Sequence, residues 1–319
     1  MHIVSAADDG FVPHFCAMLH SAWLYNPDAD YSLLASEISP GNLDLLRAFA
    51  RERDIALEII AVGAEKIAGL PLHSRFTAST WLRLLIPEAL PQSVGRALYL
   101  DADITVNGSL DDLFALDMCG HPVAAVPDRQ DFVELEKTLL RLERTSLYFN
   151  SGVMLLDLKK WREENIASLI LAFGKVMDSR LGLMDQSALN HVLRGRIHRC
   201  DNRWNFFDLE QASLVPDPAI IHHSGEIKPW ASSLAAFCDL YAFHRRNTPW
   251  PLSAALPNPG AGIRPWLKNR RRRIGGWLGV RRYRSLIEQG DRLEAALAGI
   301  SEGALDRARR LLAGRNFPG

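Results

Sequence analysis

The chain has 319 residues, of which 48% are hydrophobic and 23% charged, a globular composition with enough apolar residues for one large core. Lys plus Arg and Asp plus Glu are equal at 37 each, which excludes a chain that is strongly basic or acidic throughout. The charges are unevenly distributed, because the segment from Arg264 to Arg284 contains nine basic residues and no acidic one. The rest of the chain therefore has 28 basic against 37 acidic residues, a net charge of −9.

The cysteines and the N-terminus bear on where the protein works. The cysteines are widely spaced, form no C-x-x-C pair and sit mostly among apolar neighbours, as reduced cysteines do: Cys16, Cys119, Cys200 and Cys238. The first twenty residues contain Asp8, Asp9 and Pro13 and lack the basic start and apolar stretch of a secretory signal. No apolar stretch reaches the length of a membrane span without a charge. We therefore expect a cytoplasmic protein.

Short apolar runs alternate with segments of helical periodicity along the first two thirds of the chain. The predicted strands are residues 3–7, 31–35, 56–62, 97–103, 122–126, 152–157 and 219–222. Helices are predicted around residues 16–23 and over 42–53, 73–86, 160–177 and 184–193. Pro87 and Pro91 are expected to break the helical pattern before the strand at 97–103. This alternation predicts an α/β fold with a parallel sheet.

Two carboxylates directly follow the apolar residues 97–100. In an extended segment Asp101 and Asp103 point the same way and can share one cation, while Ala102 faces the opposite side. Two such carboxylates repel each other unless a cation lies between them, and the carboxyl end of a central strand is where open α/β sheets bind ligands. The functional interpretation is a divalent metal site. A polar exit from the strand is the simpler explanation for so short a motif.

A second polar motif follows the strand predicted at 219–222. The segment IIHHSGEIKPW, residues 220–230, begins as a strand and ends as a turn. The His222 imidazole could complete a cation site with the two aspartates. Gly225 allows close backbone approach, and Lys228 supplies positive charge for a phosphate. Taken alone, His222 is better explained as an ordinary hydrogen-bonded histidine.

The order and spacing of these motifs resemble glycosyltransferase family 8, the retaining enzymes that include glycogenin and bacterial lipopolysaccharide α-galactosyl- and α-glucosyltransferases. The resemblance extends over about residues 3–230 and includes the Asp-x-Asp pair and the family's His-x-x-Gly-x-x-Lys-Pro-Trp turn, here HHSGEIKPW. It implies a single Rossmann-like nucleotide-diphospho-sugar transferase fold of the GT-A type. It also implies a UDP-sugar as the donor substrate.

The resemblance assigns roles to two further stretches. The stretch AADDGF, residues 6–11, resembles the loop that holds the nucleoside, so Ala6 and Asp8 are expected to meet the base and Phe11 to stack on it. Gly10 departs from the family, in which asparagine can occupy this position, and removes one polar contact. The stretch TWLR, residues 80–83, resembles the helix that supplies an arginine near the donor, so Arg83 is the candidate for a diphosphate or sugar contact. The alternative is an exposed salt-bridge arginine.

The metal site implied by the resemblance has three protein ligands: Asp101, Asp103 and His222. Mn²⁺ is the expected ion, with Mg²⁺ as the alternative. A mixed oxygen and nitrogen ligand set suits Mn²⁺ better than Ca²⁺, and a dication neutralises a diphosphate as it leaves the sugar. Gly225 and Lys228 are expected to grip the diphosphate, and Ala102 is placed among the substrate-binding residues.

Two stretches resemble the region around the donor sugar and the acceptor, namely YFNSGVMLLD at 148–157 and MDQSALN at 184–190. They supply three candidates for hydrogen bonds to sugar hydroxyls, Asn150, Asp185 and Gln186, and Ser151 is placed among the substrate-binding residues. Asp128, after the strand at 122–126, matches another sugar-contacting acid and joins Asp185 and Gln186 as a catalytic candidate. Helix caps and loop hydrogen bonds are the structural alternative for each, and the one we favour for Asn190 and Asp157.

Beyond Trp230 the resemblance fades. Prolines between 249 and 259 predict a hinge, so we expect a catalytic domain over 1–250 and a helical C-terminal region over 251–319. The segment 264–284 interleaves arginine with tryptophan and leucine, which suits an anionic membrane surface better than nucleic acid. A solvated basic tail is the simplest alternative. Residues 291–312 have helix-spaced leucine and alanine and are expected to pack on the body or to pair with another chain.

Together these features predict a retaining α-glycosyltransferase that moves a hexose from UDP-galactose or UDP-glucose to a saccharide or glycolipid acceptor. Lipopolysaccharide or surface-glycan synthesis at the cytoplasmic face of the inner membrane is the expected setting. Retention requires a covalent intermediate or attack from the face that UDP leaves. Gln186 is the nearest candidate on the opposite face, but an amide is a poor nucleophile, so front-face attack is favoured. A metal-dependent sugar-nucleotide hydrolase or an inactive sugar-nucleotide-binding module would use the same phosphate-holding residues.

Overall fold

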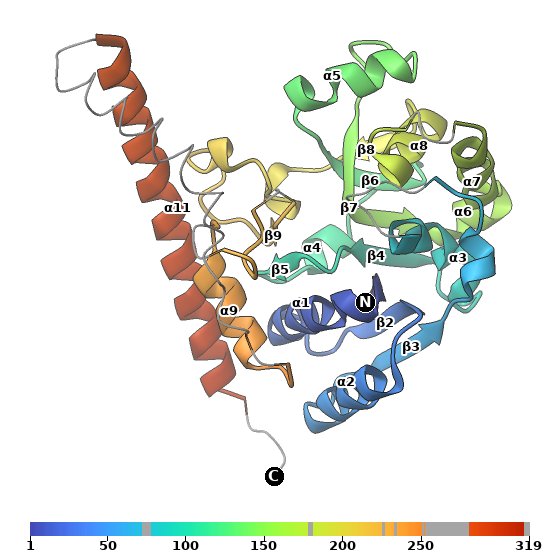
Figure 1. Ribbon diagram of the computed structural model, residues 1–319, viewed down its shortest axis with the longest axis horizontal. Coiled ribbons are helices and arrows are strands. Elements are labelled where there is room, and N and C mark those ends of the chain that lie inside the picture. The colour runs from blue at the N-terminus through green and yellow to red at the C-terminus, as the bar shows by residue number, and fades with distance from the viewer. Residues whose placement is uncertain are drawn as a thin grey trace.

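The computed structural model describes residues 1–71, 78–177, 181–224, 227–232, 235–250, 252 and 281–315. A seven-stranded sheet with the order β3-β2-β1-β4-β7-β6-β8 lies at its centre (Figure 1). Its strands in chain order are β1 (His2–Asp8), β2 (Asp30–Ser36), β3 (Leu57–Ala61), β4 (Arg96–Leu100), β6 (Val123–Pro127), β7 (Phe149–Asp157) and β8 (Ile197–Arg199). Strand order reverses between β1 and β4, and open α/β sheets bind ligands at such a point.

Six strands of this sheet are parallel to one another, and β7 is antiparallel to its neighbours β4 and β6. The predicted α/β fold is therefore confirmed, with one reversed strand in a mostly parallel sheet. The reversal places the first residues of β7 at the edge where the parallel strands end. There the Asp101 amide donates a hydrogen bond to the Gly152 carbonyl at 2.8 Å.

Side chains of the central strands alternate between two hydrophobic layers. Leu98 and Leu100 of β4 pack in the layer that contains α1 (Val12–Tyr25) and α2 (Pro40–Glu52), whereas Ala97 and Tyr99 pack in the other. The second layer is formed by the 3₁₀ helix η3 (Ala78–Leu85), α3 (Ile86–Ala89), α6 (Leu158–Glu163), α7 (Ile166–Met177) and α8 (Met184–Val192). A strand covered on both faces is apolar at successive positions, which explains the run ALYL at 97–100.

Two predicted helices differ from the structure. The helix predicted at 160–177 is two helices, α6 and α7, and the break contains Asn165, whose φ of 52° cannot continue a right-handed helix. The helix predicted at 73–86 is a 3₁₀ helix from Ala78 to Leu85, and residues 73–77 lie outside the described part. Pro87 does not break the pattern, because it occupies the first turn of α3, where a missing amide hydrogen costs little.

A second, two-stranded sheet unites the two polar motifs. In it β5 (Ile104–Val106) pairs antiparallel with β9 (Ile220–His222), and Ile104 lies opposite His222. Since Ile104 directly follows Asp103, this pairing carries the histidine to the aspartates. The sequence did not indicate β5, nor several other elements: η1 (Asp9–Phe11), η2 (Ala64–Ile67), α4 (Asp111–Phe114), α5 (Gln130–Leu139), β8, η5 (Asn202–Trp204), η6 (Leu209–Gln211) and α9 (Cys238–Arg246).

The C-terminal helix α11 (Arg281–Ala313) lies along α9 and α1 (Figure 1). Its Ile300, Ala304 and Ala308 are buried, and Arg307 Nη2 lies 2.8 Å from Asp217 Oδ1. Of the two alternatives for residues 291–312, packing on the body is the one observed. None of the described helices is both long enough and apolar enough to cross a lipid bilayer.

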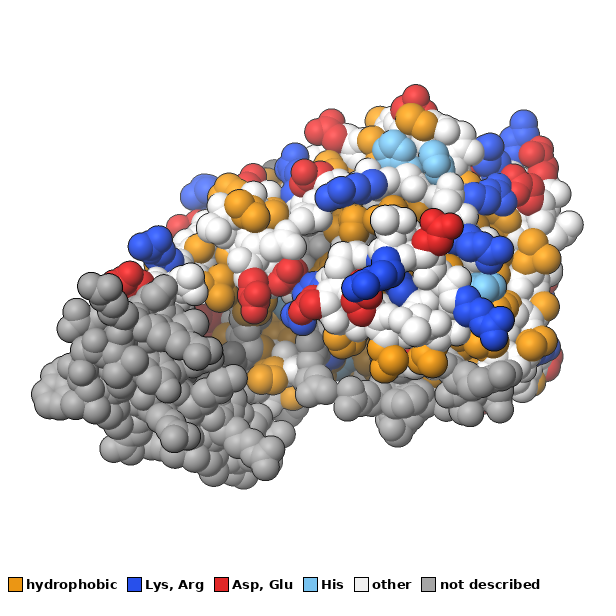
Figure 2. All heavy atoms as spheres, turned by 90° about the horizontal axis from the view of Figure 1, so that it is seen from above, with side chains coloured by type: hydrophobic (Ala, Val, Ile, Leu, Met, Phe, Trp, Pro, Cys, Tyr) orange, Lys and Arg blue, Asp and Glu red, His pale blue; other side chains and the backbone are white. Residues whose placement is uncertain are grey.

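Most of the predicted hinge and most of the basic segment, residues 251 and 253–280, lie outside the described part of the chain. On the face of the molecule shown in Figure 2, acidic and basic side chains of the described residues are interspersed with hydrophobic ones.

Candidate active site and metal centre

The candidate site begins where β4 ends. Oδ1 of Asp101 accepts a hydrogen bond from the Tyr99 hydroxyl at 2.6 Å and pairs with Nη2 of Arg83 at 3.0 Å. Its other oxygen, Oδ2, lies 3.9 Å from Nε2 of His222. One oxygen of Asp101 is thus held by protein donors, and the other faces the imidazole.

Asp103 faces the same imidazole. Its Oδ1 lies 3.3 Å from Nε2 of His222, and its Oδ2 lies 2.7 Å from Nζ of Lys228. Lys228 also donates a hydrogen bond to the carbonyl of His223. Burial alone would raise the pKa of Asp103, but His222 and Lys228 outweigh burial and hold that pKa well below its usual range. Asp103 is therefore an ionised carboxylate at neutral pH.

Asp101, Asp103 and His222 each offer a ligand atom, and these atoms lie within 4.8 Å of one another. Two carboxylate oxygens with one imidazole nitrogen suit Mn²⁺ and similar divalent ions. The space beside them depends on Gly152. A Cβ at that position would lie 2.3 Å from Cε1 of His222 and 2.8 Å from Oδ2 of Asp101, so any side chain there would displace the ligands.

The orientation of His222 is set by Asn205. Oδ1 of Asn205 lies 2.9 Å from Nδ1 of His222, and Nδ2 of Asn205 donates to Oδ1 of Asn150 at 2.9 Å. Because the Asn205 amide nitrogen is bound to Asn150, its oxygen faces the ring, and this network assigns the proton to Nδ1. Nε2 is then the nitrogen left to coordinate a cation between the aspartates. This is the tautomer that a metal ligand needs.

Arg83 is buried among carboxylates, so the alternative of an exposed salt-bridge arginine is wrong. Its Nε lies 3.1 Å from Oδ2 of Asp185, and its Nη1 donates to the Ser151 carbonyl at 2.8 Å. Burial opposes the charge on Arg83, but Asp101 and Asp185 outweigh burial and raise its pKa. For Asp185 burial prevails over the nearby arginine and raises its pKa to about 6.

The side-chain amide of Gln186 is held at both ends. Its Oε1 accepts a hydrogen bond from the Ser151 amide at 3.0 Å, and its Nε2 donates to Oδ2 of Asp128 at 2.9 Å. Asn150 Nδ2 lies 3.4 Å from the same Asp128 oxygen. Burial raises the pKa of Asp128, although these donors oppose the shift. Gln186 therefore has one defined orientation, anchored by Asp128.

The loop after β1 meets the turn that carries Lys228 and Trp230. Oδ1 of Asp8 accepts a hydrogen bond from the Phe11 amide at 3.2 Å and so caps η1. The ring of Phe11 meets Trp230 edge-on, with ring centroids 6.3 Å apart. Ala6 and Phe11 are half-buried. The contacts of Ala6, Asp8 and Phe11 with a nucleoside remain predictions.

Four other sequence predictions have different outcomes. The Ala102 side chain packs in the hydrophobic core, so only its backbone is free to meet a ligand. Gly225 lies outside the described residues. The structural roles favoured for Asn190 and Asp157 are confirmed, since Asn190 hydrogen-bonds both backbone groups of Phe149 and Asp157 caps α6.

Three residues of the site were missed by sequence reasoning. Tyr99 was assigned only to the strand, and Asn205 lies in a loop to which no role was given. Gly152 had a usable signal, because a glycine inside a strand often marks a close approach of other groups. Asn205 had none, since its role depends on the fold bringing it to His222.

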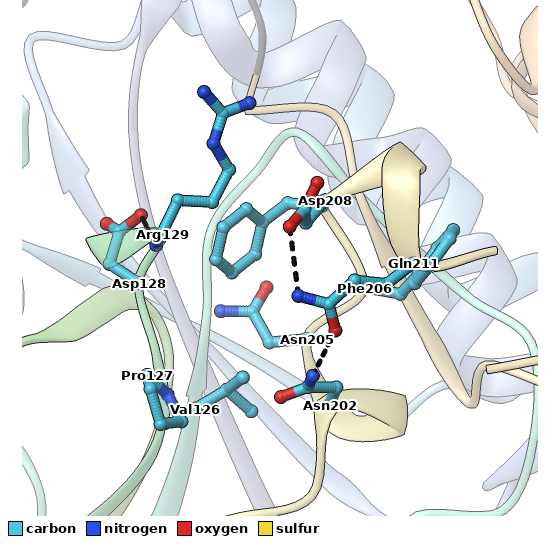
Figure 3. Close-up of a pocket in the computed structure, with 10 residues that line it drawn as sticks. Val126, Pro127, Asp128, Arg129, Asn202, Asn205, Phe206, Asp208 and Gln211 are labelled. Carbon is cyan, nitrogen blue, oxygen red and sulfur yellow. Dashed lines mark hydrogen bonds between the residues drawn. The ribbon is translucent and has the colours of Figure 1, made fainter. Parts of the chain in front are cut away.

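A pocket lies between the end of β6 and the loop from Asn202 to Gln211 (Figure 3). Gln211 bridges that loop, donating from Nε2 to Oδ2 of Asp208 at 2.9 Å and accepting from the Asn202 amide. The lining combines aromatic, amide and charged groups: Val126, Pro127, Asp128, Arg129, Asn202, Asn205, Phe206, Phe207, Asp208 and Gln211. Asp128 and Asn205 also bind Gln186 and His222, so the pocket adjoins the candidate metal centre.

Comparison with known proteins decides the family. The model of glycosyl transferase family 8 matches residues 2–233. The chain belongs to glycosyl transferase family 8. The resemblance noted from its motifs is thus confirmed, and by family the chain is a glycosyltransferase.

Several named proteins are similar in sequence to this family 8 member. General stress protein A of Bacillus subtilis is 29% identical over 273 residues, which cover 78% of this chain and 94% of the relative. Lipopolysaccharide 1,3-galactosyltransferase of Salmonella typhimurium is 27% identical over 226 residues, covering 66% and 67% of the two chains. Lipopolysaccharide 1,2-glucosyltransferase of Escherichia coli is 25% identical over 237 residues, covering 69% and 70%.

The fold has a solved counterpart. A crystal structure of the galactosyltransferase LgtC in complex with donor and acceptor sugar analogues superposes with a TM-score of 0.72 and 27% sequence identity. The match covers 82% of this chain and 99% of LgtC. The GT-A type fold expected from the resemblance is confirmed by this similarity.

Proposed function

We propose that this chain transfers galactose or glucose from UDP-galactose or UDP-glucose to a saccharide or glycolipid acceptor, with retention of anomeric configuration and with Mn²⁺. One observation carries the proposal. Three candidate metal ligands and Lys228 converge at the end of β4 although they come from two distant parts of the sequence. The names of the Salmonella and Escherichia relatives support a hexose as the transferred sugar and lipopolysaccharide or a similar glycan as the product.

The residues around the cluster fit a divalent ion held by Asp101, Asp103 and His222. Gly152 leaves the space free, and Asn205 orients His222 as a ligand. A bound dication supplies the positive charge that a departing diphosphate needs. Lys228, at 2.7 Å from Asp103, would place a second positive charge beside that diphosphate and so stabilise the leaving UDP oxygen.

The hydrogen bonds of the site divide the predicted sugar contacts into two groups. Ser151 is engaged by Arg83 and Gln186, and Asn150 accepts from both the Gly152 amide and Asn205. Both therefore serve mainly as supports. Asp185, Gln186 and Asp128 are themselves ion-paired or hydrogen-bonded, and we propose that their remaining carboxylate lone pairs and amide hydrogen bind sugar hydroxyls.

Retention by front-face attack is the mechanism we favour. The Gln186 amide is fixed by Ser151 and Asp128, at 3.0 and 2.9 Å, which suits a dipole that steadies a cation-like sugar. An amide is a poor nucleophile, and the hydrogen bonds of Gln186 do not make its oxygen a better one. Asp185, buried and paired with Arg83, would support the position of the sugar rather than attack it.

The pocket in Figure 3 is the proposed position of the acceptor. It shares Asp128 with the network that holds Gln186, so an acceptor hydroxyl in the pocket would lie near the donor sugar. Its mixture of rings and hydrogen-bonding side chains suits a saccharide. A sugar-nucleotide hydrolase would not need such a pocket, which favours the transferase.

Association with an anionic membrane at the cytoplasmic face is part of the proposal and depends on the segment 264–284. Its nine basic residues would each contribute on the order of 1 kcal/mol near such a surface. Co-sedimentation with anionic vesicles should fall as salt rises, because screening weakens this attraction. Binding to neutral and anionic vesicles alike would contradict it. Since α11 packs on the body, neutralised arginines are a cleaner test than truncation.

The function is tested by a panel of UDP-sugars with Mn²⁺ or Mg²⁺, with and without extracted membrane glycolipid. We expect UDP release from UDP-galactose or UDP-glucose to require the metal and to be accelerated by the acceptor, with the sugar in α linkage. Metal-dependent release of free sugar that no acceptor changes would favour the hydrolase. A β-linked product would contradict retention.

A further inference from the structure

Four aromatic side chains form a cluster beside Lys228, and we call Phe11, His14, Trp230 and Tyr241 the aromatic cluster. The His14 imidazole stacks on the Trp230 indole, with ring centroids 3.9 Å apart and an interplanar angle of 28°. Nδ1 of His14 lies 2.7 Å from the Tyr241 hydroxyl. Phe11 meets the edge of His14 at 5.5 Å between centroids. His14 thus touches each of the other three members, directly or by hydrogen bond.

The cluster joins three separate parts of the chain. Phe11 and His14 belong to the first loop and α1, Trp230 to the turn after β9, and Tyr241 to α9. Helices α1 and α9 pack on each other, which holds His14 and Tyr241 at a fixed separation (Figure 1). The turn meets this pair through two rings, Trp230 against His14 and His223 against Tyr241.

Trp230 is coupled to Lys228 in two ways. Nζ of Lys228 lies 5.7 Å from the centroid of the Trp230 ring, a cation–π contact. The carbonyl of Lys228 accepts hydrogen bonds from the amides of Ala231 and Ser232, at 3.0 and 3.1 Å, which closes a tight turn around Trp230. A displacement of the indole would therefore move the backbone that carries Lys228.

We propose that His14 is a positioning residue, which holds Lys228 against Asp103 through Trp230. The proposal rests on the function proposed above, in which Lys228 serves the diphosphate. A lysine side chain has four rotatable bonds, so the placement of its backbone decides how often Nζ reaches the diphosphate. Burial lowers the pKa of His14 to about 4, so the ring is neutral at pH 7 and stacks without a charge to desolvate.

The test compares single and double variants of the full-length chain. We would measure UDP affinity by calorimetry in saturating Mn²⁺, together with kcat and KM for UDP-galactose and UDP-glucose. His14→Ala should weaken UDP binding and lower kcat/KM for the donor by about tenfold, within the range for residues of one contact network. In a Lys228→Ala background the same substitution should have almost no further effect.

Conservative variants separate positioning from general packing. His14→Phe keeps the stacked ring and loses the hydrogen bond, so it should recover part of the loss caused by His14→Ala. Tyr241→Phe removes the same hydrogen bond and should match His14→Phe, without addition in the double variant. The matched control is His191→Ala, which removes an imidazole stacked on Phe173 at 4.1 Å and should leave UDP affinity unchanged.

Each outcome decides a different claim. If His14→Ala lowers UDP affinity by the same factor in the unaltered chain and in the Lys228→Ala background, the positioning role is overturned. His14 would then act independently of the lysine. A fall in Mn²⁺ affinity as large as the fall in UDP affinity would overturn it too, since Lys228 is not a ligand. If the unaltered chain binds no UDP in Mn²⁺, the proposed function fails and this inference fails with it.

Discussion

The end of β4 and the contact between α1 and α9 both hold buried polar side chains, and they do so in different ways. At the end of β4, Asp101 and Asp103 each have a cationic partner, Arg83 and Lys228. Between α1 and α9, the Nδ1 atoms of two histidines lie 3.0 Å apart. These histidines are His20 and His244. Within the described part of the chain, the Nε2 atom of neither ring has a hydrogen-bond partner.

The difference shows that the partners of a histidine, and not its burial, decide what it can do. His222 is buried with two carboxylates before its Nε2 and an amide oxygen at its Nδ1, so it can serve a cation. Burial, with Arg53 nearby, lowers the pKa of His20 to about 3, and burial holds that of His244 well below its usual range. Those two rings are neutral core residues, whereas Asp103 keeps its charge because His222 and Lys228 lower its pKa.

The largest expected effect comes from removing one charge of the cluster. Asp103→Asn should abolish Mn²⁺-dependent transfer while the chain stays folded, because the change removes a ligand charge and almost no volume. Transfer rates at limiting Mn²⁺ and a thermal melt measure the two effects. Asp217→Asn, which breaks the exposed pair with Arg307, is the matched control. Near-normal transfer by Asp103→Asn would show that the aspartate pair is not the metal site.

The next effect concerns the cation beside the cluster. Lys228→Ala should lower kcat/KM for the UDP-sugar by roughly 10²-fold, the usual loss when one charge-stabilising donor is removed. Acceptor KM should change little, because the lysine is assigned to the diphosphate. The same substitution at exposed Lys66, which pairs with Glu88, provides the control. A change confined to acceptor KM would contradict the role of Lys228.

A smaller effect is expected from filling the space beside the cluster. Gly152→Ala would place a Cβ 2.3 Å from the His222 ring and should reduce Mn²⁺ affinity by about 10- to 100-fold, as other disturbances of ligand orientation do. Gly41→Ala is the control, because a Cβ at position 41 meets no atom within 4 Å. Unchanged Mn²⁺ affinity in Gly152→Ala would mean that the ion does not lie between these ligands.

The smallest effect concerns the stability of the histidine pair between α1 and α9. Histidines in an unfolded chain titrate near pH 6.5, whereas the buried pair stays neutral, so the unfolded state takes up protons that the folded state refuses. The free energy of unfolding should therefore fall as pH drops from 6.5 towards 4. Over two pH units this amounts to roughly 3 kcal/mol for each fully neutral histidine.

Replacing both rings by leucine of similar volume should flatten this acid slope. His20→Leu with His244→Leu should leave stability at pH 7 nearly unchanged, because both hydrogen-bonding partners disappear together. Either single substitution should cost about 1–3 kcal/mol, since it leaves the remaining Nδ1 without its partner. Chemical unfolding between pH 4 and 7 measures these values. If the free energy of unfolding falls with pH as steeply in the double variant as in the unaltered chain, the claim that the two buried histidines stay neutral is contradicted.

Local sequence patterns were sufficient to predict most of the sheet but not its pairing. The run ALYL followed by Asp101 identified β4, since a strand buried on both faces has to be apolar. Nothing local indicated that β7 is reversed, because strand direction depends on how the chain returns to the sheet. The same holds for β5, whose three residues form a strand only through pairing with β9.

The candidate site divides along the same line. Asp101, Asp103 and His222 were proposed from spacing and family resemblance, and the structure brings their ligand atoms within 4.8 Å. Asn205 and the contact of His14 with Trp230 could not be proposed, because each depends on residues far apart in sequence. The burial of Arg83 between two carboxylates was missed for the same reason. Tyr99 is different, since it lies two residues before its partner Asp101 and was assigned only to the strand.

The central claim is that the aspartates at the end of β4 and His222 bind a divalent ion that serves UDP. Electron paramagnetic resonance of free Mn²⁺, titrated with the full-length chain in the presence and absence of UDP, tests it most directly. We predict a single Mn²⁺ per chain, bound more tightly with UDP, and loss of that binding in the double variant Asp101→Asn with Asp103→Asn. Equal Mn²⁺ binding by the unaltered chain and the double variant would contradict the account.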